Sequence, residues 1–437
     1  MYDRANIELS NKALKMVTDL FPLCRSIAGA QNRQTLEYIK EQVGIEIKSI
    51  PSSTNVFDWI VPQEWHIQDA YIKNENGEEV VSFSDNNLHV VNYSQPVKKL
   101  MSLAELKKHI FTLEDQPNAI PYVTSYYKKS WGFCMAYNQL KTLPDGKYEV
   151  CVDSSFHNGE MVFGEKLISG KKNDEIIFVS YICHPSLAID NLSSVATLAY
   201  FSDIILREPR KYSYRLLLLP ETIGSIAWLA SKSNSDLQNI RAGLVFSCLG
   251  GNAEFSYKCS PKQNAIIDSA VIKILGGEAN IIQFDPSTGS DERQFCSPGF
   301  DLPIGMISRN YPGTFPEYHT SMDNLNLIKN KDFERNFDLL ETLIAELERG
   351  KTVLNRVRPQ CEPMLGKRGM YHLNSKKKPL GFAREKDLRT AIMWVLHSSN
   401  GKNSLEDIVQ MSGLAIELVK NAVDLCIENE LIFEDQV

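Results

Sequence analysis

Side chains that bind metal ions or move protons stand where the strand patterns of this sequence end, or in the loops that follow. They are His184, Asp190, Glu221, Cys248 and His319. Imidazole, carboxylate and thiolate groups are the ligands that zinc prefers in proteins. A zinc ion lowers the pKa of its bound water towards neutrality, and a nearby carboxylate takes the proton. If the fold brings these side chains together, the set predicts a metal hydrolase.

The first strand and helix of this series would position two of the side chains. The β-branched apolar run 176–182 predicts a buried strand, and His184 stands directly after it. Asp190 follows a short loop, and a helical pattern begins there. In open α/β sheets this edge is where ligands bind. The structural alternative is that Asp190 only caps the helix and that His184 packs beside Pro185.

The other candidates follow three more apolar runs or lie in polar loops. Glu221 follows the run 214–220, although it could be only a charge favoured at a helix N-terminus. Cys248 lies in the run 242–249, where a small buried residue is the structural alternative. His319, in a polar loop, is either a ligand or a packing residue.

Two more acids lie in the turn-rich loop 286–295. Asp291 and Glu292 would join the same edge of the sheet, unless they only hold their loop through Arg293. The joint pattern of candidates is more specific than any single member.

Strands and helices alternate from residue 175 onward, which predicts an α/β fold with a mostly parallel sheet covered on both faces. We expect a discontinuous core of residues 1–45 and 165–355, interrupted by a β-rich domain at 46–164. Residues 356–378 would be a linker, and the helical pattern of 379–437 predicts a winged helix.

The composition is that of an ordinary globular protein. Of the 437 residues 43% are hydrophobic and 23% charged, and the net charge of −7 gives no sign of binding to nucleic acid or anionic membrane. No apolar stretch is long enough to span a bilayer, and the N-terminus lacks the pattern of a signal peptide. The nine scattered cysteines, with no CxxC pair, predict reduced thiols and a cytoplasmic setting.

The order of these motifs resembles that of co-catalytic zinc aminopeptidases of the aminopeptidase Y/glutamate carboxypeptidase type. The motifs are His184, Asp190-Asn191, ETIGS (221–225), GSD (289–291) and YHTSMD (318–323). More closely, five segments resemble a bacterial subfamily that is identified as aminopeptidase-like and associated with polysaccharide biosynthesis. These are VPQEW (61–65), WGFC (131–134), CHPS (183–186), PETIGS (220–225) and GSDER (289–293).

The resemblance covers nearly the whole chain. It implies a phosphorylase/hydrolase-like α/β sandwich with an inserted β-rich domain and a C-terminal winged helix. It also implies zinc, with His184, Asp190 and His319 as ligands.

The sequence departs from the wider family at three positions. The family has two adjacent glutamates, a base and a ligand, where this chain has Glu221 between Pro220 and Thr222. Cys248 stands near the place of an aspartate ligand, and Ser186 stands where the family has an acid. We therefore expect one or two zinc ions, and Glu221 is either the base or a ligand.

The leading hypothesis is a zinc-dependent aminopeptidase that cleaves an N-terminal amide of a small peptide or another amide-bearing molecule. Glu221 would take the proton of the zinc-bound water. Asp291 or Glu292 would hold the substrate ammonium, and Tyr318 would donate to the oxyanion. One alternative is an amidase or deacetylase acting on an amino-sugar or amino-acyl glycan. Another is an inactive, peptidase-like binding or regulatory protein.

The charge of the C-terminal segment argues against a DNA-binding role. From residue 379 onward there are five Lys or Arg against ten Asp or Glu, a balance of −5. Contacts to phosphates supply most non-specific affinity for DNA. We therefore expect this segment to contact protein, in packing or dimerisation, and the chain could form a homo-oligomer.

Overall fold

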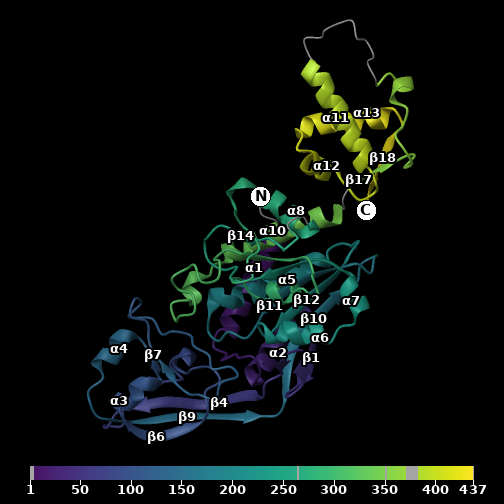
Figure 1. Ribbon diagram of the computed structural model, residues 1–437. Helices are drawn as coiled ribbons and strands as arrows, with labels where there is room; N and C mark the ends of the chain where they lie inside the picture. The colour runs from purple at the N-terminus through teal and green to yellow at the C-terminus, as the bar shows by residue number, and fades with distance from the viewer. Residues whose placement is uncertain (1–3, 263–264, 350–351, 371–381, 437) are drawn as a thin grey trace. The chain divides into compact units, whose positions relative to one another are not determined.

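The computed structural model describes residues 4–262, 265–349, 352–370 and 382–436 (Figure 1). The chain forms two compact units, residues 1–348 and 349–437, and each is described by itself. In the described ranges, none of the helices combines the length and the apolar character needed to cross a bilayer.

The first unit is built on an eight-stranded mixed sheet with the order β1-β10-β12-β11-β13-β16-β14-β15. Its strands are β1 (Glu46–Pro51), β10 (Glu160–Ile168), β11 (Glu175–Tyr181), β12 (Ser213–Leu219), β13 (Ile240–Phe246), β14 (Ser256–Lys258), β15 (Asn280–Ile282) and β16 (Ile304–Ser308). Strands β12, β11, β13 and β16 are parallel neighbours, so their C-terminal ends lie at one edge. Strands β1, β10 and β14 pair antiparallel with their neighbours. The predicted α/β fold is confirmed, with a mixed sheet.

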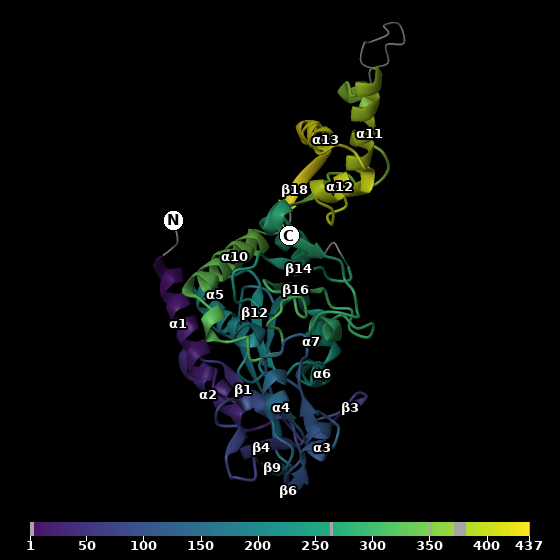
Figure 2. The same ribbon diagram turned by 90° about the vertical axis from the view of Figure 1, so that its left-hand side faces the viewer.

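Helices cover both faces of this sheet because its central strands are apolar on both sides. Phe178 packs into one hydrophobic cluster and its neighbour Val179 into another. Helices α1 (Arg4–Leu20), α2 (Ala30–Val43), α5 (Ser194–Ile205), α8 (Ile266–Leu275) and α10 (Asn330–Arg349) bury residues in the first cluster. Helices α6 (Ile223–Ala230), α7 (Asn234–Gln238) and α9 (Glu292–Phe295) bury residues in the second. Figure 2 shows α1, α5 and α10 on one side of the sheet and α6 and α7 on the other.

The insertion contains a four-stranded antiparallel sheet with the order β5-β4-β9-β6, and its hydrophobic cluster also includes residues of the α/β core, such as Cys183 and Ile223. The strands are β4 (Glu64–Lys73), β5 (Glu79–Ser82), β6 (Val97–Ser102) and β9 (Lys147–His157). The smaller elements are a hairpin of β2 (Asn55–Val56) and β3 (Trp59–Ile60), a parallel pair of β7 (Ile110–Phe111) and β8 (Phe133–Cys134), α3 (Leu103–Leu106), α4 (Tyr137–Thr142), η1 (Asn87–His89) and η2 (Lys107–His109). Strand β1 and the start of β10, which the sequence assigned to the insertion, belong to the large sheet.

The second unit contains three helices and a two-stranded sheet. They are α11 (Phe382–Ser398), α12 (Leu405–Ser412), α13 (Ile416–Glu428), β17 (Thr352–Arg356) and β18 (Ile432–Gln436), with the short turn η6 (Leu365–Arg368). Strand β17 pairs antiparallel with β18, whereas the sequence assigned residues 352–355 to the first domain. Residues 371–378 of the predicted linker and 379–381 of the predicted winged helix lie outside the described residues.

Candidate functional site

The C-terminal edge of the parallel strands gathers most of the predicted site residues. His184 follows β11, Glu221 follows β12, and Cys248 follows β13. Asp190 lies at a kink in the turn η3 (Ala188–Ser193), between β11 and α5, where its backbone is not helical. His319 lies in the loop between β16 and the short turn η5 (Leu325–Leu327). The topology therefore explains why residues far apart in sequence meet.

His184, Asp190 and His319 form the tightest group. One ligand atom from each lies within 4.8 Å of the others. Asp190 Oδ2 is 3.0 Å from His319 Nε2 and 3.8 Å from His184 Nε2. Asp190 is fully buried, and His184 is 6% exposed. Burial opposes the charge of Asp190, yet His184 and His319 hold its pKa well below the usual range, so the carboxylate is ionised.

Hydrogen bonds fix the orientation of Asp190. The Tyr181 hydroxyl donates to Asp190 Oδ1 at 2.5 Å. The backbone N–H groups of Ile189 and Asp190 donate to the carboxyl group of Asp323, at 2.6 and 2.9 Å. Burial raises the pKa of Asp323 to about 7. Asp323 therefore holds the turn that presents Asp190, and it belongs to the motif 318–323.

Glu221 stands beside this group and is the most open of the acids. Glu221 Oε2 lies 3.9 Å from His184 Nε2, and the Ser290 hydroxyl donates to Glu221 Oε1 at 2.6 Å. Its side chain is 30% exposed. Cys183, His184 and Glu221 form a second group with one ligand atom each within 4.8 Å of the others. Burial raises the pKa of the Cys183 thiol well above its usual value.

The backbone around the site adopts conformations that non-glycine residues rarely take. Ser186, Thr222, Cys248 and His319 all have positive φ, at 40°, 63°, 51° and 55°. Such residues cost free energy and cluster at functional sites, where the surrounding structure holds them. Four of them next to one group of titratable side chains mark this edge as the functional one.

Cys248 is buried, which agrees with the alternative of a small buried residue, whereas Glu292 is not placed to bind a substrate. Cys248 belongs to neither ligand group among the described residues, and its Sγ lies 3.9 Å from the Tyr181 hydroxyl. Glu292 forms a buried ion pair with Lys258 at 2.9 Å, and both side chains are 0% exposed. Because the Glu292 carboxylate is buried and already paired with Lys258, it is not accessible to the ammonium group of a substrate.

Asp291 is buried and supports the loop that carries Glu221. Its Oδ1 accepts from the backbone N–H of Thr222 at 2.8 Å and from the Ser225 hydroxyl at 2.9 Å. Burial and the nearby Glu221 raise the pKa of Asp291 to about 8. Tyr318 stacks on His319, with ring centroids 3.9 Å apart. Its ring therefore lies beside one of the candidate ligands, and its role as an oxyanion donor stays a prediction.

Sequence reasoning missed Tyr122, which the insertion contributes to the site. Its ring lies 5.1 Å from those of both His184 and His319. The Tyr122 N–H donates to the His319 carbonyl at 2.7 Å, and the Ser321 N–H donates to the Ile120 carbonyl at 2.8 Å. The sequence offered little that could have singled out Tyr122, because it is one tyrosine in a segment with no regular strand or helix pattern.

The donor atoms fit a metal cation. Asp190 Oδ2 and His319 Nε2 are buried and have no hydrogen-bond partner, although they lie within ion-pair distance. Buried polar atoms are normally satisfied, and a cation between these two facing atoms would satisfy both. Two imidazoles and a carboxylate are a set that zinc accepts. His184, Asp190 and His319 would hold it.

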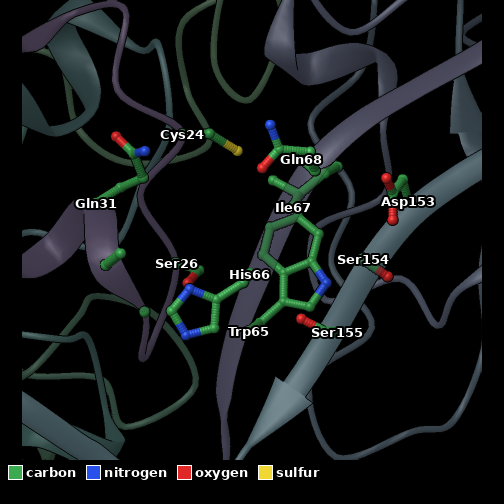
Figure 3. Close-up of a pocket in the computed structure, with 12 residues that line it drawn as sticks. Cys24, Ser26, Gln31, Trp65, His66, Ile67, Gln68, Asp153, Ser154 and Ser155 are labelled. Atoms are coloured by element: carbon green, nitrogen blue, oxygen red, sulfur yellow. The ribbon is translucent and has the colours of Figure 1, made fainter.

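A separate cavity of about 270 Å³ lies between the start of α2 and strands β4 and β9. Gln31, Trp65, His66 and Asp153 are among the residues that line it (Figure 3). None of the candidate ligands does, so this hollow is distinct from the metal-binding group.

Comparison with known proteins identifies the family. A family model described as a domain of unknown function, DUF4910, matches residues 14–350. The chain belongs to the DUF4910 family. In this DUF4910 chain a second model, a winged helix-turn-helix, matches residues 352–434, which confirms the predicted C-terminal winged helix.

A curated relative of this DUF4910 chain is named for an aminopeptidase-like domain. A Clostridium acetobutylicum protein is 42% identical over 99% of this chain and 98% of its own length. It is named a polysaccharide biosynthesis protein with an aminopeptidase-like domain. This confirms the subfamily that the motifs indicated.

Solved structures show the same fold. A crystal structure from Clostridium acetobutylicum, named a peptidase, matches with a TM-score of 0.79 and 40% identity, over 98% of this chain and 97% of the other. A zinc aminopeptidase from Bacillus subtilis matches with a TM-score of 0.57 and 13% identity, over 77% of this chain and 95% of the other. The zinc-aminopeptidase-like fold of the first unit is therefore confirmed, and at a coarse level the aminopeptidase-like fold is that of a hydrolase.

Proposed function

We propose that this protein is a zinc-dependent hydrolase that cleaves an amide bond, most simply the N-terminal amide of a small peptide. One observation carries the proposal. His184, Asp190 and His319 converge, with Asp190 Oδ2 and His319 Nε2 buried and unsatisfied. A bound zinc ion would act as a Lewis acid that activates water and polarises the substrate carbonyl.

Two residues beside the proposed ligands support a role in amide hydrolysis. Glu221 is the general base: its Oε2 lies 3.9 Å from His184 Nε2, and the hydrogen bond from Ser290 fixes its other oxygen. Glu221 would take a proton from water and pass it to the leaving amine. Tyr318, stacked on His319, would donate to the oxyanion of the substrate. His184, Asp190 and His319 supply the donors of one zinc site, and Cys248 belongs to neither ligand group among the described residues, so we favour one ion.

The substrate has two candidate classes. The similarity of the fold to aminopeptidases favours a peptide. The name of the 42% identical relative, which refers to polysaccharide biosynthesis, supports the second class, an amide on an amino-sugar or amino-acyl glycan. The rates of hydrolysis of aminoacyl amides and of N-acetyl sugars by the same preparation would separate the two classes.

Elemental analysis of bound metal is the direct test. We expect about one zinc per chain in the native protein and loss of that zinc in His184→Ala, because the variant removes one of three protein ligands. His157→Ala is the matched control, since His157 is exposed on β9 and belongs to neither ligand group. A chain that takes up no zinc even when zinc is supplied would instead be an inactive, peptidase-like binding protein.

A further inference from the structure

Exposed aromatic side chains gather where the insertion meets the core. Phe57 is 66% exposed, Trp59 38% and Tyr127 54%. The Phe57 ring contacts Phe300 of the core at 5.7 Å, and the Trp59 ring contacts Tyr127 at 5.5 Å. Phe57 and Trp59 lie in one hairpin, which joins the two ring pairs; the four rings are here called the aromatic rim. Exposed apolar groups that gather in this way mark binding sites more often than single exposed residues do.

The backbone under the aromatic rim is strained. Phe57 and Tyr127 have positive φ, at 55° and 62°, and so does Asp301, next to Phe300, at 48°. For a bulky residue this conformation is a true outlier, and such outliers persist where the surrounding structure over-determines them. The β2–β3 turn would be served better by asparagine or glycine than by Phe57. The chain thus holds aromatic rings in water at a cost in free energy, which points to a use for them.

The aromatic rim adjoins the candidate site. Tyr127 follows Tyr126, whose hydroxyl lies 3.2 Å from that of Tyr122, and the Tyr122 ring contacts both candidate histidine ligands. At the other side, the hairpin packs against α6 through Val56, in one hydrophobic cluster with Ile223 and Ile226. Helix α6 begins directly after the loop of Glu221. Both segments that carry the rim, the hairpin and residues 126–127, are thus linked by packing or by the chain to residues beside the candidate site.

We propose that the aromatic rim binds a saccharide ring of the substrate, which makes the substrate a glycan that carries an amide. Exposed aromatic rings suit a sugar, because the apolar C–H face can pack on the ring while the hydroxyl groups stay in water. Charges of both signs flank the rim, Asp58 on the hairpin and Lys128 and Lys129 after Tyr127, so a neutral ligand fits better than a polyanion. This inference rests on the proposed amide hydrolase.

Saccharide binding by the full-length chain tests the proposal without relying on hydrolysis. The probes are diacetylchitobiose and maltose, and binding is followed by saturation-transfer NMR. We expect at least one disaccharide to bind, and Trp59→Ala and Tyr127→Ala each to weaken its binding about fivefold or more, as loss of a stacking ring does. Trp59→Phe and Tyr127→Phe keep a ring and should keep most of the binding. Phe111→Ala is the matched control, an aromatic residue of the insertion that is 43% exposed and outside the rim.

Several results would overturn the proposal. The first is that the native chain binds neither disaccharide. The second is that Trp59→Ala and Tyr127→Ala bind a disaccharide as tightly as the native chain does. The third is that Phe111→Ala weakens binding as much as the rim variants do. A change from dimer to monomer in Trp59→Ala without saccharide binding would show instead that the rim contacts a second copy. Hydrolysis of aminoacyl amides is measured separately. A chain that binds saccharide through the rim but hydrolyses no amide would keep the saccharide site and refute the proposed reaction.

Discussion

At the scale of single residues, Glu221 decides how the site works. The family that the sequence resembles uses two acids where this chain has one. The Glu221 carboxylate lies 3.9 Å from Nε2 of His184, a candidate ligand, so Glu221 is placed to act either as a further ligand or as a base. The hydrogen bond from Ser290 leaves Oε2 free to exchange a proton with water.

Replacing Glu221 by glutamine separates the two roles. The amide still accepts the hydrogen bond from Ser290 but cannot take a proton. We expect kcat to fall by about 10²–10⁴-fold with zinc content unchanged, measured by steady-state kinetics and elemental analysis on one preparation. Glu37→Gln, an exposed change on α2, is the control. Loss of zinc in Glu221→Gln would make Glu221 a ligand.

Tyr122 should position the histidine ligands through its ring. Because that ring packs against both imidazoles, Tyr122→Ala leaves space beside them and should weaken zinc affinity by about tenfold, measured by competition with a chelator. Tyr122→Phe keeps the ring and should bind zinc like the native chain. Equal affinity in all three proteins would contradict the positioning role.

The sequence was informative about residues that follow buried strands and much less so about residues brought in by loops. His184 and Asp190 could be found because an apolar run ends beside them and parallel strands share one edge. Tyr122 could not, because its contact with His319 joins positions about two hundred residues apart in irregular segments. The ion pair of Glu292 could not be foreseen either, because its partner Lys258 lies on a different element, β14, and only the fold brings the two together.

At the scale of secondary-structure elements, one buried carboxylate ties strands of the large sheet together. Glu165 on β10 is 2% exposed and pairs with Arg215 of β12, with Lys48 of β1 and with Lys232, which follows α6. The sequence predicted the alternation of strands and helices but assigned β1 to the insertion. Short alternating runs look alike whichever sheet they join, and only long-range pairing decides the sheet.

Acid should destabilise the sheet through Glu165. Burial alone would raise its pKa, but Lys48, Lys232 and Arg215 lower it from 4.5 to about 2. The folded pKa is the lower one, so the stabilisation is present above about pH 4.5 and is lost as the pH falls through about 2. We expect a loss of about 2 kcal/mol in the free energy of unfolding over this range, after allowing for solvent screening.

Denaturant titrations of the native chain and of Glu165→Gln at several pH values measure this contribution. The variant should be less stable near neutral pH, and the difference between the two proteins should narrow as the pH falls from 4.5. A difference that stays constant with pH would show that Glu165 contributes packing and hydrogen bonds only.

At the scale of the whole molecule, the chain divides into two units with separate hydrophobic cores. Every candidate ligand, the base and Tyr122 lie in the first unit. The chain shortened to residues 1–348 should therefore bind as much zinc as the full chain, measured by elemental analysis, with a native circular dichroism spectrum. A folded but zinc-free product would show that the second unit contributes to the site.

The winged helix should bind DNA weakly, because its acidic residues outnumber its basic ones. Filter binding of the full chain to random duplex DNA should give no retention at low salt, where attraction to phosphates is strongest. A basic winged-helix protein serves as the positive control. Tight binding that falls steeply with added salt would contradict this expectation and show that the few cations gather on one face.

The backbone pairing between residues 120–122 and 319–321 has a consequence for how the protein is made. A chain that leaves the ribosome has completed the insertion, β11 and Asp190 long before His319 is synthesised. The strand-like contact that anchors His319, through Tyr122 and Ile120, must therefore wait for most of the core. A partly synthesised chain presents only two of the three predicted ligands, so tight zinc capture would be a late event in folding that reports a completed first unit.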